Sequence, residues 1–261
     1  MTFLCILAVL GLVAGIVSLE ESRVCEPHSR PWQVRLHGAG SQSCSGVLID
    51  KWWIITAFAC FPVSDSTTAS LGEHDLKADE GTEQHITVAE VIPHSPYRSP
   101  LHSLTMVRLS RPAQLNQYVR PLPLPGKCPQ PGDTCSVSGW GSTGPNPNEF
   151  PGLLKCLKVP IVDRQTCEST FDEFIYWSEG MVCAGRANTD NCLRDGGAVL
   201  ECDGQLQGVQ WFDHSCNDPS HPSVYTKLCL YNRWINNVMD HFTPFDTTPE
   251  PSTATQMMSN E

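Results

Sequence analysis

Cysteine is the residue type that offers this sequence its most evident chemistry. The 261-residue chain has 13 cysteines, and cysteines in such numbers either pair as disulfides or bind metal ions such as zinc. Setting aside Cys5, which lies in an apolar leader, leaves an even number, and this favours six disulfides. The sequence has no Cys-x-x-Cys pair and no histidines at zinc-finger spacing, so we do not expect a cysteine-bound metal.

The leader indicates where the chain is sent. Phe3 to Val17 is an almost unbroken apolar run that is too short to cross a bilayer comfortably. It resembles the hydrophobic region of a secretory signal peptide, with cleavage after Ser18. Cleavage after Ala14 or Gly15, and retention as a signal anchor, are the alternatives. We therefore expect a secreted, extracellular protein without a membrane span.

Length and charge narrow the function classes. A chain of this length holds one large domain or two small ones. Its 40% hydrophobic content is ordinary for a globular core, and its formal net charge is -11. An acidic balance argues against nucleic-acid binding, which needs a basic surface.

Short β-type runs separated by glycine and proline follow the leader, and this pattern is typical of a sandwich or barrel. The runs are 32–36, 46–49, 53–56, 86–92, 105–109, 135–138, 155–162, 205–210 and 223–227. Leu230 to Phe242 has helical spacing and predicts a short C-terminal amphipathic helix. The Thr-, Pro- and Ser-rich stretch 243–261 is predicted to be disordered.

Several motifs together point to one family. Cys25-Glu-Pro-His-Ser-Arg-Pro-Trp-Gln-Val, Gly139-Trp-Gly, Gly204-Gln-Leu-Gln-Gly and Val224-Tyr-Thr-Lys occur in order along the chain, and they resemble the trypsin/chymotrypsin family of serine proteases. The resemblance implies an all-β fold of two packed six-stranded antiparallel β-barrels with a short C-terminal helix. We expect a signal peptide at 1–18, the trypsin-like domain at 19–242 and the tail at 243–261.

The resemblance also implies how the cysteines pair, which the sequence alone does not decide. The implied disulfides are Cys25–Cys156, Cys44–Cys60, Cys128–Cys229, Cys135–Cys202, Cys167–Cys183 and Cys192–Cys216.

The family's catalytic triad is where the chain departs most from the pattern. The serine hydroxyl needs a histidine to take its proton and a carboxylate to orient that histidine. On the matching motifs, the histidine position is Ala59, the aspartate position is Ser103 and the nucleophile position is Gly196. The oxyanion-hole glycine is Arg194, whose side chain would disfavour the backbone conformation that aims the amide.

The specificity pocket and the activation sequence are also altered. Asp190 matches the trypsin aspartate that pairs with a substrate Lys or Arg, but Asp213 and Ser223 stand where the pocket walls are glycines. Asp190 is either a relic or a remaining site for a basic side chain. A cut after Ser18 would start the chain at Leu19, whose ammonium could reach Asp195; a free, exposed N-terminus is the alternative.

The segment from Glu73 to Glu83 resembles the calcium loop of trypsins. Calcium takes oxygen ligands in a flexible loop. The resemblance assigns carboxylates of Glu73, Glu80 and Glu83 and backbone carbonyls of Asp75 and Ala78 as ligands. A solvated acidic loop without metal is the alternative reading.

These observations predict a secreted trypsin-like protein that cuts no peptide bonds and is not an enzyme. It would act by binding proteins, namely a protease, an inhibitor or a receptor, and would be a monomer with no catalytic cofactor. The alternative is a serine-type endopeptidase with residual or unconventional activity at Lys and Arg sites.

Overall fold

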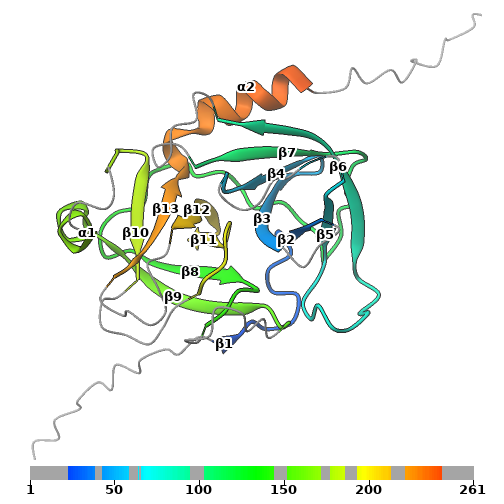
Figure 1. The fold of residues 1–261 in the computed structure, drawn as a ribbon, viewed down its shortest axis with the longest axis horizontal. Helices are drawn as coiled ribbons and strands as arrows, with labels where there is room; N and C mark the ends of the chain where they lie inside the picture. The colour runs from blue at the N-terminus through cyan, green and yellow to red at the C-terminus, as the bar shows by residue number, and fades with distance from the viewer. Residues whose placement is uncertain are drawn as a thin grey trace, which may run out of the picture.

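The structure is a computed structural model of the whole chain (Figure 1). It describes residues 23–38, 43–58, 64, 66–94, 103–143, 152–171, 177–185, 193–212 and 221–242.

The first half of the chain forms a closed antiparallel barrel. Its strands follow one another around the barrel as β2 (Gln33–His37), β3 (Ser43–Asp50), β4 (Trp53–Thr56), β7 (Thr105–Leu109), β6 (Gln84–Pro93) and β5 (Thr68–Leu71). Alternation sets which side chains point inward, so Val34, Leu36 and Leu71 are buried in its interior. Gly46 allows β3 and β4 to approach, because a Cβ there would lie 2.9 Å from Ile54.

The second half forms another ring of six strands. Its strands are β8 (Thr134–Gly139), β9 (Lys155–Val162), β10 (Met181–Ala184), β13 (Ser223–Lys227), β12 (Gln205–Phe212) and β11 (Val199–Cys202). β8 pairs with both β9 and β11, which closes the ring, and the short β1 (Arg23–Val24) adds to β9. Asp203 and Gly204 connect β11 to β12 with φ of 51° and 73°, the positive angles that a two-residue hairpin requires.

Helices lie outside the barrels. α1 (Arg164–Phe171) begins after Asp163, whose carboxylate accepts the amide of Thr166 at 2.9 Å as an N-cap. The 3-10 turn η1 (Leu228–Leu230) leads into α2 (Asn232–Phe242). In Figure 1, α2 lies across the top of the two barrels.

The barrels and α2 share one apolar cluster. It combines Ile55 and Met106 of the first barrel with Val209 of the second, and with Ile235 and Val238 of α2. The helix therefore fastens the two halves together, and its apolar face is what the sequence periodicity predicted.

Replacing Ile235 by valine tests this fastening. Ile235 is fully buried, so removing one methylene should lower the free energy of unfolding by about 0.5–1.5 kcal/mol. Urea denaturation of the variant measures the change. Asn236→Ala, on the exposed side of α2, is the control and should change stability by no more than about 0.5 kcal/mol.

The predicted fold is confirmed: two six-stranded antiparallel barrels and a short C-terminal helix. The sequence reading missed α1 and the strands β1, β5, β10 and β11. β5 is only four residues of Thr-Ala-Ser-Leu, too short and too polar to stand out by composition.

Four of the predicted disulfides are present: Cys25–Cys156, Cys128–Cys229, Cys135–Cys202 and Cys167–Cys183. Cys44 is also disulfide-bonded, but its predicted partner Cys60 lies outside the described residues, as do Cys192 and Cys216. In the part of the chain that the structure describes, no helix has the length and apolarity needed to span a membrane.

Candidate functional site

The segment 193–198, just before β11, is held against the first barrel by Asp195. The Asp195 carboxylate accepts the hydroxyl of Ser45, on β3, at 2.6 Å and the backbone amide of Trp140 at 2.6 Å. The backbone amide of Ser45 in turn donates to the carbonyl of Gly196 at 2.9 Å. These bonds join the two barrels at the segment that carries the nucleophile position.

Glycines make this close approach possible. A Cβ on Gly139 would lie 2.2 Å from the Asp195 carboxylate, and one on Gly141 would lie 1.9 Å from the Arg194 carbonyl. Gly197 has φ of 83°, and a Cβ on it would lie 1.9 Å from the Ser45 carbonyl oxygen. The Gly-Trp-Gly motif therefore works as a seat for Asp195, since any larger residue on either side of Trp140 would displace it.

Enclosure changes the acidity of Asp195. Desolvation raises the pKa of this carboxyl to about 6, although the bonds from Ser45, Trp140 and Gly141 act in the opposite direction. The residue as a whole keeps some accessible surface, but the carboxylate itself faces the donors. The donors that surround it here are a hydroxyl and backbone amides.

Of the three predicted triad positions, the structure describes two. Ser103 is buried, 3% exposed, and its hydroxyl has no hydrogen-bond partner among the described residues. Its backbone carbonyl accepts the Thr226 hydroxyl of β13 at 2.9 Å, so it too lies where the barrels meet. Gly196 is exposed and offers no hydroxyl. Ala59 lies outside the described residues.

An orphaned buried hydroxyl needs an explanation. A carboxylate at the Ser103 position would serve to hold an imidazole, and Ala59 supplies none. The Ser103 hydroxyl, which has no partner in the part of the chain that the structure describes, fits the prediction that this position carries the triad aspartate in the family.

Arg194, the predicted oxyanion-hole position, has its backbone amide in an intramolecular hydrogen bond. The backbone amide of Arg194 donates to the carbonyl of Ser142 at 2.9 Å, and the two residues form an isolated β-bridge. An amide with an intramolecular partner has to exchange it before it can stabilise a developing oxyanion.

The predicted pocket residues are only partly testable. Ser223 is the first residue of β13, half-buried and paired with Ala184. Asp190 and Asp213 lie outside the described residues. Of these three residues the structure therefore describes only Ser223, and the pocket for a basic side chain stays a prediction.

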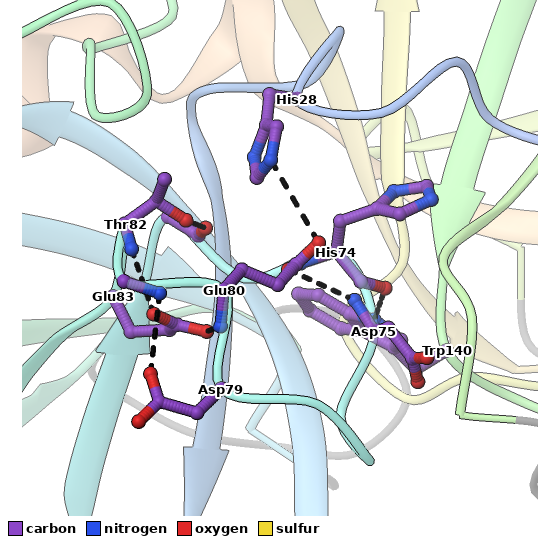
Figure 2. Close-up of polar contacts among 10 residues, drawn as sticks. His28, His74, Asp75, Asp79, Glu80, Thr82, Glu83 and Trp140 are labelled. Carbon is purple, nitrogen blue, oxygen red and sulfur yellow. Dashed lines mark hydrogen bonds and ion pairs between the residues drawn. The ribbon is translucent and has the colours of Figure 1, made fainter.

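The acidic loop 73–83 is a compact turn held by its own amides (Figure 2). The carboxylate of Glu80 accepts the amides of His74 at 2.8 Å and Asp75 at 3.1 Å. Glu83 accepts the amides of Glu80 at 2.7 Å and Thr82 at 2.8 Å. These carboxylates therefore already organise the loop that the resemblance assigns to calcium.

Two further contacts connect this loop to its surroundings. The His28 imidazole lies 3.7 Å from the Glu80 carboxylate, and Figure 2 shows this ring pointing toward Glu80. The indole of Trp140 donates to the His74 carbonyl at 3.2 Å. Trp140 thus connects the loop to Asp195, since its backbone amide bonds the Asp195 carboxylate and its indole bonds the His74 carbonyl.

Glu73 lies among other acidic side chains. Burial raises the pKa of Glu73 to about 7, and Glu83, Glu80 and Asp75 push it in the same direction, while Arg35 opposes them. A cation would relieve this repulsion. Among the described residues, however, no three His, Cys, Asp or Glu side chains are arranged to hold a metal ion. The charge suits calcium, while the side-chain geometry does not form a ligand sphere.

The sequence reading missed the partners of Asp195. Nothing in the type or spacing of Ser45 distinguishes it from other serines, because its role depends on a contact across 150 residues of chain. The Gly-Trp-Gly motif was noticed only as a family resemblance, and its physical reason emerges from the close approach of Asp195.

Comparison with known proteins agrees with this architecture. The Trypsin family model matches residues 20–235. Kallikrein-8 of Mus musculus is 37% identical over 248 residues, which cover 90% of this chain and 94% of that protein. Trypsin of Xenopus laevis is 37% identical over 92% of this chain and 99% of its own. The solved structure "neuropsin, a serine protease expressed in the limbic system of mouse brain" has a TM-score of 0.75 at 40% identity, covering 84% of this chain and 99% of that one.

These relatives correct one prediction. The expectation that the chain is not an enzyme is wrong on this comparison, because proteins 36–40% identical over most of its length are kallikreins, trypsins and a solved serine protease. The prediction rested on the side chains at three positions. Gly196 has no hydroxyl, and this excludes a serine nucleophile at that residue only.

Proposed function

Since the chain belongs to the trypsin family, we propose that it is a secreted serine-protease homologue that acts on protein substrates as an endopeptidase of unconventional mechanism, at Lys and Arg sites. The observation that supports this is that the segment 193–198 is held firmly in place. The Asp195 carboxylate accepts the Ser45 hydroxyl, and Gly197 donates its amide to the Gln210 carbonyl at 2.8 Å. In the family, this segment lies next to the scissile bond of the substrate.

The mechanism cannot pass through an acyl-enzyme at Gly196, which has no hydroxyl. Water is then the nucleophile, and the protein contributes by binding the substrate and orienting it. Residual catalysis of this kind, without a working triad, is on the order of 10³–10⁴-fold over water. The engaged Arg194 amide places this chain at the low end of that range.

The absence of a covalent step supplies the test. Purified mature protein is incubated with fluorogenic peptides that carry Lys, Arg or Glu before the scissile bond, with and without a serine-reactive phosphonate. We expect slow turnover of the Lys and Arg peptides that the phosphonate does not abolish. Turnover that the phosphonate removes would come from a contaminating protease, and either that result or no turnover overturns the proposal.

A matched pair of variants separates binding from contamination. Asp190→Ser should raise KM for the Lys and Arg peptides, because it removes the proposed partner of the basic side chain. Asp240→Ser, on the exposed side of α2, makes the same charge change and should leave KM unaltered.

Secretion and protein partners belong to the same proposal. Four disulfides support an oxidising compartment, and the family supports protein substrates or protein inhibitors as partners.

We also propose that calcium binds the 73–83 loop as a structural ion, since Glu73 is partly buried close to the carboxylates of Glu80 and Glu83. Binding requires these two glutamates to exchange the backbone amides that they accept for the ion. Calcium held by the folded state alone stabilises it, by about 2.7 kcal/mol at a hundred times the dissociation constant. EDTA should therefore lower the Tm by several degrees. In Glu73→Gln the Tm should no longer respond to EDTA. An unchanged wild-type Tm in EDTA would leave the loop as a self-bonded acidic turn.

A further inference from the structure

A surface groove beside β1 is lined by more basic than acidic residues. The groove encloses about 300 Å³ and ten residues line it. Three of them are basic, namely Arg23, Arg30 and Lys158, on a chain whose formal net charge is -11. Glu26 is the one acid in the lining.

Strand register explains why these groups share one face. Arg23 on β1 lies opposite Cys156 on β9, and Lys158 lies opposite Ser136 on β8. Directly opposed residues, and residues two apart on a strand, point to the same side of a sheet. Leu157 and Val159 point into the barrel and are buried, so Lys158 and Arg23 stand on the outer face, where both are exposed.

Arg30 reaches the same face from the loop after β1. Its guanidinium donates to the Ser136 hydroxyl at 3.1 Å and to the Ser29 carbonyl at 3.2 Å, and it lies 5.8 Å from the Trp32 ring centroid. Its Nε is buried without a hydrogen-bond partner. Among the described residues, no carboxylate lies within ion-pair distance of Arg23 or Arg30.

The guanidinium groups of Arg23 and Arg30 line the same groove, and like charges held close together raise the free energy unless a counter-charge binds between them. Guanidinium groups suit carboxylates, which they can meet through two parallel hydrogen bonds. Val24 and the Cys25–Cys156 disulfide line the same groove and offer apolar contact to the methylene groups of an acidic side chain. The volume exceeds what an isolated inorganic anion fills and suits one or two side chains of a peptide.

We propose that this groove is a second binding site, which docks an acidic segment of a protein partner through its Asp and Glu side chains. Its lining includes none of Ser103, Arg194 and Gly196, so it does not depend on the proposed peptidase activity. It would recognise a substrate or inhibitor away from the scissile bond.

The test is fluorescence polarisation of a labelled Glu-rich peptide with the full mature protein, beside the same peptide with Gln in place of Glu. We expect the Glu peptide alone to bind, and more weakly at 300 than at 50 mM NaCl because salt screens exposed charges. Arg23→Glu with Lys158→Glu should weaken binding about tenfold or more. Arg111→Glu with Arg233→Glu, which changes net charge equally at exposed positions, should leave it near the wild-type value.

Equal loss in the two double variants would indicate attraction to overall charge and overturn the proposal. So would equal binding of the Glu and Gln peptides, or binding of inorganic sulfate with none of the Glu peptide. Because both groove side chains are exposed, an unchanged Tm in the variants confirms that loss of binding is local. Turnover of the fluorogenic peptides by the groove variant should equal that of the wild type, which keeps this result separate from the proposed activity.

Discussion

Four substitutions should convert slow, phosphonate-resistant turnover into ordinary serine-protease activity. We expect Ala59→His, Ser103→Asp, Arg194→Gly and Gly196→Ser together to raise hydrolysis of Lys and Arg peptides roughly 10²–10⁴-fold, the usual contribution of a positioned general base. The new hydroxyl should also react covalently with a serine-reactive phosphonate, which the wild type should not.

The structure gives physical grounds for this expectation. The Ser103 side chain is buried, and its hydroxyl has no hydrogen-bond partner among the described residues, so a carboxylate there displaces no existing side-chain bond of this residue. Gly196 follows an aspartate that is already anchored and precedes a glycine with φ of 83°. Arg194→Gly removes the side chain and lets the amide leave the Ser142 carbonyl for the cleft.

A matched variant carries the first three substitutions with Gly196→Ala in place of serine. It has the same base, the same carboxylate and the same oxyanion position but no nucleophile, so it should neither gain turnover nor become labelled. If both variants gained equally, the base would be acting on water. If neither gained although the wild-type Tm is kept, the cleft would differ from the family's in more than these four positions.

The fold was largely predictable because it rests on features that leave marks in the sequence. The alternating runs of β2, β4 and β7 and the 3.6-residue spacing of α2 are local patterns. α1 escaped because it has eight residues and buries only Cys167 and Phe171. β11 was not predicted because Val-Leu-Glu-Cys is too short to show a strand pattern.

The site was less predictable, since its contacts join residues far apart in the chain. The residues at the predicted triad positions can be identified from the matching motifs, but the bond from Ser45 to Asp195 and the partner of the Arg194 amide depend on the three-dimensional fold. The basic groove likewise brings together residues that are far apart in the chain. Arg23, Arg30 and Lys158 look like scattered surface charges until strand pairing places them on one face.

Asp195 should make the folded protein less stable as the pH rises, which is the opposite of the effect of a paired carboxylate whose pKa is lowered. Its pKa is raised to about 6 in the folded protein, against about 3.9 in an unfolded chain. Between these values the folded state holds a proton that the unfolded state has lost. The contribution of Asp195 to stability is therefore complete below pH 4, declines as the pH rises through 6, and stays low above it.

Comparison with Asp195→Asn isolates this effect, because asparagine does not titrate in this range. The wild-type minus variant difference in the free energy of unfolding should fall by roughly 2–3 kcal/mol between pH 4 and pH 7.5, since each pKa unit is worth about 1.4 kcal/mol. Urea denaturation at half-unit pH steps measures it. A constant loss of hydrogen bonds in the variant shifts the whole curve and does not alter its slope.

The sign of this change with pH also shows whether Asp195 pairs with an ammonium group. An ammonium at Leu19 within reach would stabilise the carboxylate and lower its pKa, so the difference would rise with pH instead of falling. Ser45→Ala provides the second reading: the Ser45 hydroxyl acts to lower the pKa of Asp195, and without it the decline should extend to higher pH. Adding one residue before Leu19 should then leave the curve unchanged, whereas a chain that depended on its N-terminus would lose stability at neutral pH.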